Sequence, residues 1–244
     1  MKHIMTENYE EMSRKVAEMV IGRIREQGNL VLGLPTGNTP IGFYQELVKD
    51  YKLNYTSYQH ARSINIDEYI GMSGDDPKSY RYYMNHHLFM HINMKKENIH
   101  IPNGLAVDVE GECFCYDQVF EEIGPMDVLI LGIGHNGHIG FNEPGTSFQS
   151  TTHKVELTEE TRQMNARHFK SLDRVPEAAI TMGLKSMMDS KEIFLMVTGD
   201  GKTEAYTQFL NGRVTEDFPA SILHSHPNLT VIVDQSTINT PDNR

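Results

Sequence analysis

The sequence has little cysteine and no long apolar run. Only two cysteines occur in 244 residues, Cys113 and Cys115, and their spacing in a helix-like stretch turns them to different faces. A disulfide framework is therefore excluded, as is typical of a reducing cytosol. No apolar run approaches the roughly 20 residues of a membrane span, and the N-terminal residues lack the apolar stretch of a signal peptide. These absences predict a cytoplasmic protein with no membrane partner.

Basic residues are also in deficit. The formal net charge is -11 and the sequence pI is about 5.5. Nucleic acids and anionic membranes attract broad basic surfaces, so neither is expected as a partner. A phosphate ligand would need donors that are concentrated locally.

Apolar runs rich in β-branched residues alternate with amphipathic stretches, the first of which stops at Gly28. This alternation predicts a single α/β domain over residues 1–244, with three αβα layers and a Rossmann-like, mostly parallel sheet. The expected strands are residues 30–34, 63–66, 128–131, 193–197 and 229–233.

One polar stretch, residues 151–173, interrupts the alternation. It is predicted as a small helical lid, although a solvated helical excursion fits the composition equally well.

The residues that follow each strand are the first candidates for a site, because ligands of parallel sheets bind beyond the carboxyl ends of the strands. After the first run comes Pro-Thr-Gly-Asn-Thr-Pro at 35–40, in which Thr39 is expected to cap a helix that starts with Pro40. Free backbone N–H groups at such a turn hold phosphate, although an ordinary strand-to-helix turn has the same pattern. The Gly-Lys-Ser/Thr ending of a nucleotide-binding P-loop is missing.

The second strand end carries two adjacent carboxylates, Asp67 and Glu68. Burying both is costly unless each has a partner or a purpose, so one of them is expected to be functional. The alternative is an acidic cap on the next segment.

The third strand end is rich in glycine over residues 132–145. It matches the Gly-x-Gly-x-x-Gly dinucleotide fingerprint, but Gly140 and Pro144 would break the long helix that the fingerprint requires. We interpret the glycines as a backbone shaped for close approach to a ligand. His138 and Glu143 then form a candidate pair, in which a carboxylate orients an imidazole for proton transfer.

Lys202 follows the fourth strand at the start of another helix, where a cation is unfavourable unless an anion binds. Arg167 is a candidate second phosphate partner from the predicted lid. His87 and His91 have helical spacing but no His-Glu-x-x-His pattern, and the zinc deaminase signature is absent. We therefore expect no metal and no cofactor.

Taken together, these motifs resemble the glucosamine-6-phosphate deaminase family in order and spacing. The matching segments are Leu-Gly-Leu-Pro-Thr-Gly-Asn-Thr-Pro at 32–40, Asn-Ile-Asp-Glu-Tyr at 65–69, Leu-Gly-Ile-Gly-His-Asn-Gly-His-Ile-Gly-Phe-Asn-Glu-Pro at 131–144, Arg167 and Lys202. The third segment is the most specific.

The resemblance implies a cofactor-free conversion of glucosamine 6-phosphate and water to fructose 6-phosphate and ammonium. His138, supported by Glu143, matches the residue that helps to open the pyranose ring, and Asp67 matches the base that moves a proton from C2 to C1. The phosphate-holding positions match Thr36, Gly37, Asn38, Thr39, Arg167 and Lys202.

The sequence departs from the hexameric members of that family at several positions. Asn136 stands where they carry an aspartate, so Glu143 is expected to provide the charged support for His138 and the pH dependence to shift. His153 and Val155 stand where the allosterically activated members have basic residues. We therefore expect a monomer or small homo-oligomer without allosteric activation.

Three other functions remain open at this stage. A 6-phosphogluconolactonase shares the fold and a phosphorylated sugar substrate, and a non-enzymatic sugar-phosphate sensor would need a partner chain for its output. Dinucleotide-dependent oxidoreduction rests only on the glycine pattern.

Overall fold

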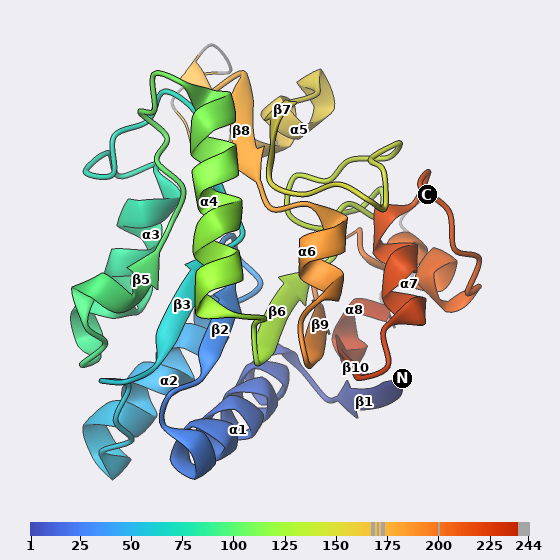
Figure 1. Cartoon of the computed structure of the whole chain (residues 1–244). Helices are drawn as coiled ribbons and strands as arrows, with labels where there is room; N and C mark the ends of the chain where they lie inside the picture. The colour runs from blue at the N-terminus through green and yellow to red at the C-terminus, as the bar shows by residue number, and fades with distance from the viewer. Residues whose placement is uncertain (167–168, 170, 172–173, 200, 239–244) are drawn as a thin grey trace.

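The computed structural model describes residues 1–166, 169, 171, 174–199 and 201–238. Strands and helices alternate along most of this chain (Figure 1). The strands are β1 (Lys2–Thr6), β2 (Val31–Leu34), β3 (Arg62–Asn65), β4 (Asp67–Tyr69), β5 (Ile99–His100), β6 (Val128–Gly132), β7 (His153–Glu156), β8 (Ala178–Thr181), β9 (Ile193–Val197) and β10 (Leu229–Asp234). The helices are α1 (Tyr9–Gln27), α2 (Ile41–Asn54), α3 (Tyr80–His87), α4 (Val109–Ile123), α5 (Glu159–Asn165), α6 (Leu184–Met188), α7 (Thr203–Leu210) and α8 (Gln235–Ile238), with 3-10 turns η1 (Phe89–His91), η2 (Lys96–Asn98) and η5 (Pro219–Ser225).

The main sheet has seven strands in the described part of the chain, in the order β1-β10-β9-β6-β2-β3-β5, and every pairing in it is parallel. This confirms the predicted α/β sheet. The five predicted strands correspond to β2, β3, β6, β9 and β10, each to within one residue at either end. The edge strands β1 and β5 escaped prediction because β1 is largely exposed and β5 is only two residues long, so neither shows an apolar run.

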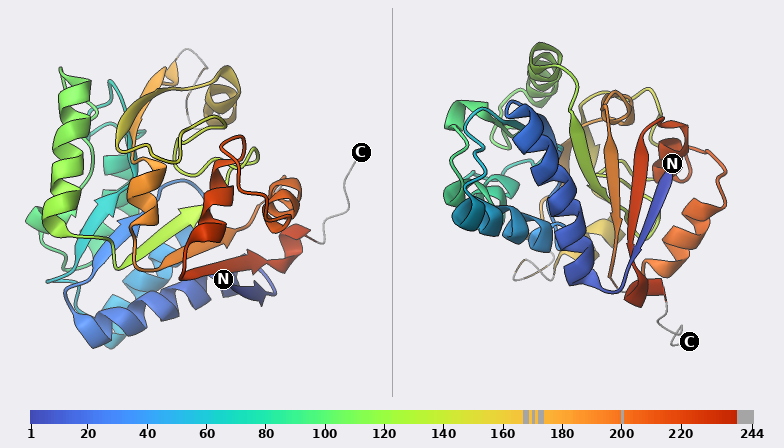
Figure 2. Two further views of the ribbon diagram at one scale, coloured as in Figure 1. Left: turned by 45° about the vertical axis from the view of Figure 1, so that its right-hand side comes forward. Right: turned by 90° about the horizontal axis from the view of Figure 1, so that it is seen from below.

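Both faces of the sheet are buried, and alternate residues of each strand point to opposite faces. Leu32 and Leu34 of β2 pack with α1 and α2, whereas Val31 belongs to the core that includes residues of α4, α6 and α7. Figure 2 shows helices on both sides of the sheet. Helix α1 ends at Gln27 with Gly28 as its C-cap, as the sequence predicted.

A second sheet, with the antiparallel order β4-β8-β7, lies at the carboxyl side of the main one. Strand β7 and helix α5 both lie within the predicted lid, so that segment is not purely helical. Prediction missed β7 because its residues alternate between intermediate and exposed positions and form no apolar run. Tyr69, Phe141, Leu157 and Ala179 form a small separate core beneath this sheet.

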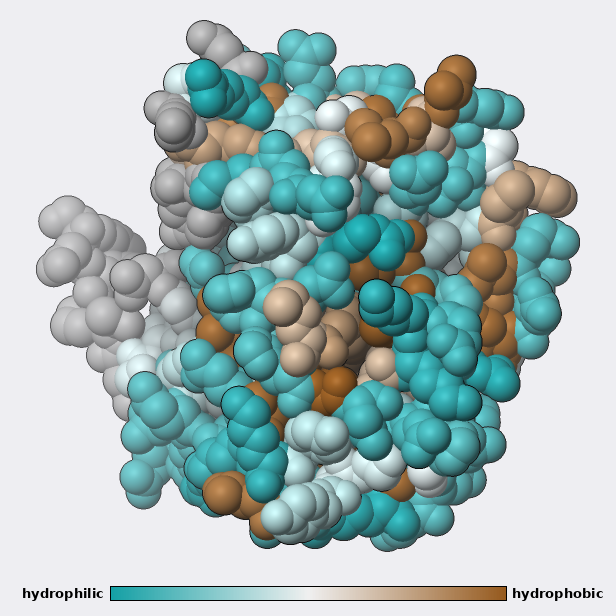
Figure 3. Space-filling model, turned by 90° about the vertical axis from the view of Figure 1, so that its left-hand side faces the viewer, coloured by the Kyte–Doolittle hydropathy of each residue, from teal (hydrophilic) through white to brown (hydrophobic). Residues whose placement is uncertain are grey.

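In the portions of the chain that are described, no helix is long and apolar enough to cross a membrane. The face seen in Figure 3 is mainly hydrophilic and carries small, separate hydrophobic areas.

Candidate active site

The four strand ends singled out from the sequence lie next to one another. Strands β9, β6, β2 and β3 are consecutive in the main sheet, and parallel strands end at a common edge. The predicted site residues therefore project from adjacent loops. This adjacency was not visible in the sequence, where the same four strands are spread over residues 31–197.

The loop after β2 contains the four predicted phosphate positions, of which Gly37 has a φ of 92° that favours glycine. The predicted N-cap at Thr39 is wrong: the cap position of α2 is Pro40, and it makes no side-chain hydrogen bond. Instead, the Tyr9 hydroxyl accepts from the N–H of Gly42 at 2.7 Å. The cap comes from α1, a long-range contact that no local pattern encodes. Residues 36–39 are not buried and stand open to a ligand.

The two carboxylates at the end of β3 have separate roles. Glu68 accepts backbone N–H bonds from Tyr69, Tyr80 and Arg81, each at 2.9 Å, and so caps the start of α3. Asp67 is also buried, yet its Oδ1 has no hydrogen-bond partner among the described residues. The structure thus satisfies Glu68 and leaves Asp67 available for chemistry.

Burial raises the pKa of Asp67 well above its ordinary value of 3.8, and the nearby charge of Glu68 raises it further. A carboxylate with a raised pKa is a stronger base near neutral pH. Asp67 is held rigidly, because it is the first residue of β4 and pairs with Thr181 of β8.

The glycine-rich loop after β6 holds a histidine ring in place. A Cβ at Gly134 would lie 2.2 Å from the His138 ring, so the ring packs directly on the glycine backbone. The N–H of Gly134 donates to the carbonyl of His138 at 2.8 Å, and Gly137 turns the chain with a φ of 82°. No helix forms over residues 133–145, which confirms that the dinucleotide fingerprint was misleading.

Asn136 joins His138 to Glu143. Its Nδ2 donates to Glu143 Oε2 at 2.7 Å, and its Oδ1 lies 2.7 Å from His138 Nδ1. The direct distance from His138 Nδ1 to Glu143 Oε2 is 3.8 Å. The predicted His138–Glu143 pair therefore exists, but Asn136 mediates it.

This arrangement fixes the direction of each hydrogen bond. An ionised carboxylate only accepts, so the amide NH₂ of Asn136 must face Glu143 and the amide oxygen must face His138. His138 then donates through Nδ1, and Nε2 is the nitrogen that accepts a proton in the neutral imidazole. An uncharged asparagine can thus orient the ring as an acidic residue would. The negative charge then lies on Glu143, one hydrogen bond further from the ring.

Strand β8 connects this loop to Asp67. Thr181 lies opposite Asp67 in the sheet, and its Oγ1 accepts from the N–H of Phe141 at 3.1 Å. The next residue, Met182, donates from its N–H to the carbonyl of Ile66 at 2.6 Å. Thr181, the last residue of β8, and Met182 directly after it therefore hold the β3 end and the glycine-rich loop in register.

The remaining predicted residues surround this centre. A Cβ at Gly132 would lie 3.7 Å from Thr39 Oγ1, which brings the loop after β2 against the end of β6. Lys202 is the N-cap residue of α7, beyond the end of β9. Arg167 lies outside the described residues.

Three contacts around the candidate site were missed in the sequence, namely those of Tyr9, Thr181 and Thr161. The buried Thr161 comes from α5 and donates from Oγ1 to Glu143 Oε1 at 2.6 Å. Thr158 precedes it by three residues and gives only the local signal of a helix start.

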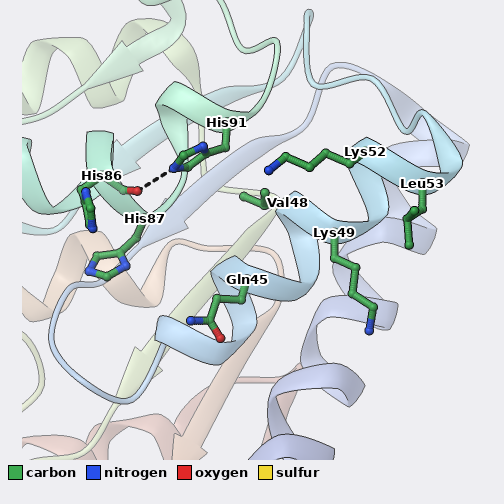
Figure 4. A pocket seen from close by; sticks show the side chains of 8 residues that line it. All are labelled: Gln45, Val48, Lys49, Lys52, Leu53, His86, His87 and His91. Carbon is green, nitrogen blue, oxygen red and sulfur yellow. Dashed lines mark hydrogen bonds between the residues drawn. The ribbon is translucent and has the colours of Figure 1, made fainter.

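A surface pocket of about 570 Å³ lies elsewhere, between α2 and the α3–η1 region (Figure 4). It is lined by Gln45, Val48, Lys49, Lys52, Leu53, His86, His87 and His91. All of these residues come from helices and none from a strand end. The pocket shares no lining residue with the candidate site and is separate from it. Its lining also offers no carboxylate that could act as a base.

Comparison with known proteins extends these observations. Residues 5–232 match the family of glucosamine-6-phosphate isomerases and 6-phosphogluconolactonases. A Geobacillus protein named glucosamine-6-phosphate deaminase is 51% identical over 245 residues, covering 100% of this chain and 98% of its own. A solved structure of a monomeric glucosamine-6-phosphate deaminase is 46% identical with a TM-score of 0.95, covering 98% of this chain and all of its own. A Thermotoga maritima 6-phosphogluconolactonase has the same fold at 16% identity, with a TM-score of 0.75 over 95% of this chain and 98% of its own.

Proposed function

The chain belongs to the family of glucosamine-6-phosphate isomerases and 6-phosphogluconolactonases, and within it we propose that the protein is a glucosamine-6-phosphate deaminase. The full-length identity of about half to proteins of that name supports the proposal. One site observation carries the proposal. The buried Asp67 carboxylate has an oxygen with no hydrogen-bond partner among the described residues, and Thr181 links its strand to the loop that orients His138. The reaction needs a carbon base and a ring-opening acid–base group, and Asp67 and His138 fit the roles.

The proposed reaction begins with ring opening. His138 handles the ring-oxygen proton through Nε2, while Asn136 and Glu143 hold its Nδ1 side. Opening exposes a carbonyl at C1, which acidifies the hydrogen on C2. Asp67 removes that proton, and the electron pair forms an enolamine.

Asp67 then returns a proton to C1, which gives an imine at C2. Water adds to the imine carbon, the C–N bond breaks, and fructose 6-phosphate and ammonium leave. Because one water is consumed, we propose a hydrolytic deamination coupled to isomerisation.

Residues 36–39, Lys202 and Arg167 are proposed to hold the phosphate. Binding at this unreactive end would position the open chain against Asp67, which contributes to the rate without contact at C2. We also propose a monomer, by analogy with the solved relative described as monomeric; light scattering on the purified protein tests it.

The decisive assay compares two substrates. Purified protein is expected to release ammonium and fructose 6-phosphate from glucosamine 6-phosphate, and to leave 6-phosphogluconolactone at its spontaneous hydrolysis rate. Folded protein that releases no ammonium but accelerates lactone hydrolysis would replace the proposal with the lactonase function.

A further inference from the structure

The side chain of Glu143 is held from two sides. Asn136 Nδ2 donates to one carboxylate oxygen at 2.7 Å, and Thr161 Oγ1 donates to the other at 2.6 Å. Glu143 and Thr161 are both buried, with 9% and 5% of their surface exposed. A buried carboxylate needs such donors, because an ionised oxygen without one carries a full desolvation penalty.

The direction of the Thr161 hydroxyl is determined by its neighbour. Thr158 Oγ1 accepts the N–H of Thr161 at 3.2 Å, and its own hydroxyl lies 3.0 Å from Thr161 Oγ1, toward which it donates. Thr161 therefore accepts from Thr158 and uses its single hydrogen for Glu143. The N-terminal turn of α5 is built to aim one hydroxyl at this carboxylate.

Other contacts fix the Glu143 backbone but not its side chain. The N–H and hydroxyl of Thr146 both donate to the Glu143 carbonyl, at 3.0 and 2.7 Å. Loss of the Thr161 hydroxyl would thus leave the main chain in place and release only the carboxylate. Asn136, which depends on that carboxylate for its orientation, would then hold His138 less firmly.

Helix α5 and the residues just before it are anchored to the segment that leads into β8. The N–H of Leu157 donates to the carbonyl of Glu177 at 2.8 Å, and Arg162 Nη2 donates to the carbonyl of Val175 at 3.3 Å. These acceptors lie just before β8, the strand that pairs with Asp67. Thr161 and the proposed base, Asp67, are therefore both held in place by contacts with β8 or the residues just before it.

We propose that Thr161 is a positioning residue, which acts through Glu143 and Asn136 to fix the orientation and Nδ1-protonated form of His138. The proposal rests on the proposed deaminase function for its kinetic consequences. It predicts that a side chain of the same shape without a hydroxyl impairs turnover, whereas a smaller side chain with a hydroxyl does not.

The test uses Thr161→Val and Thr161→Ser. We expect Thr161→Val to lower kcat roughly 10-fold, the effect of losing one hydrogen bond to a charged group, with little change in KM. Without its donor, the Glu143 carboxylate would hold Asn136 and the His138 ring less firmly, so the kcat–pH profile should shift from that of the wild type. Thr161→Ser should restore both.

Thr152→Val is the matched control. Thr152 is a buried threonine close to β7 in sequence, and its hydroxyl has no hydrogen-bond partner in the described chain. This variant should keep the wild-type kcat and pH profile. The proposal is overturned if Thr161→Val keeps both wild-type values, or if Thr161→Ser loses as much activity as Thr161→Val with an unshifted profile.

A spectroscopic readout separates this proposal from the deaminase assignment. Side-chain ¹⁵N NMR, with the His138 signal assigned from a His138→Gln spectrum, should show a mainly Nδ1-protonated neutral ring in the wild type and a more mixed ring in Thr161→Val. This holds even if glucosamine 6-phosphate is not the substrate. An identical tautomer ratio in both proteins would overturn the positioning role, and Thr161→Ala serves if the valine variant does not fold.

Discussion

The glycine-rich loop over residues 132–145 and the β7–α5 segment over residues 153–165 contribute to one hydrogen-bond network by different means. The loop positions His138 through its own backbone, because Gly134 and Gly137 shape a turn that the ring packs on. The β7–α5 segment contributes a single hydroxyl, from Thr161, placed by strand pairing and by Thr158. Local sequence determines the first contribution, and tertiary structure determines the second.

The difference explains why the loop was readable in the sequence and the segment was not. Glycines at fixed offsets from a histidine are a local pattern with a physical cause. A threonine that meets a glutamate 18 residues away leaves no such pattern. Substitutions in the two regions should therefore differ in the size of their effects on kcat and Tm.

The largest of these expected effects follows from Gly134→Ala. The added Cβ would meet the His138 ring at 2.2 Å, so the ring must move. Because a displacement of about 1 Å at a reacting group costs on the order of 100-fold, kcat should fall by that factor. Steady-state kinetics of ammonium release measures it.

Gly22→Ala is the control for that variant, since a Cβ at this position in α1 meets nothing within 4 Å. It should keep full activity and slightly raise Tm, because alanine favours the helix. Wild-type kcat in Gly134→Ala would show that the loop backbone does not set the position of His138.

A smaller effect concerns stability at Asp67, which lies where the main sheet meets the small one. Burial raises the pKa of this carboxyl in the folded protein, so the native state binds its proton more tightly than the unfolded chain does. Asp67 therefore lowers the stability of the folded protein progressively as the pH rises above 3.8, the ordinary pKa of this carboxyl. Asp67→Asn should have a higher Tm than the wild type at pH 7, and the difference should shrink toward pH 4.

Each kcal/mol gained corresponds to about 2–4 °C for a domain of this size, so scanning calorimetry at several pH values resolves the trend. A lower Tm for Asp67→Asn at pH 7 would mean that the charged form is stabilised in the fold, contrary to the burial argument.

The smallest effect is expected from Lys154→Ala in β7. Lys154 Nζ lies 2.6 Å from Glu156 Oε1, but both side chains are largely in solvent, with exposed fractions of 41% and 69%. Exposed pairs of this kind contribute little. Tm and kcat should both stay at wild-type values, and a clear loss of either would show that β7 supports the site through its surface as well as through Thr161.

Much of the fold could be predicted because the central strands are buried on both faces and read as apolar runs. At the site, prediction recovered Asn136, His138 and Glu143 as neighbours. That one of Asp67 and Glu68 is functional stays a prediction. The residue pattern alone could not tell the two carboxylates apart, and only the family resemblance singled out Asp67. Two of the N–H groups that satisfy Glu68 come from residues 12 and 13 positions later. The Tyr9 cap escaped prediction for the same reason, since its hydroxyl reaches Gly42 across 33 residues.

The central claim is that Asp67 removes the hydrogen from C2 of glucosamine 6-phosphate. Following that hydrogen by ¹H NMR in D₂O measures the step directly, in the wild type and in folded Asp67→Asn. The account predicts that the wild type removes the C2 hydrogen as fructose 6-phosphate forms, and that Asp67→Asn slows this loss by about 10²–10⁴-fold, the usual contribution of a positioned base. Loss of the C2 hydrogen at the wild-type rate in Asp67→Asn would contradict it.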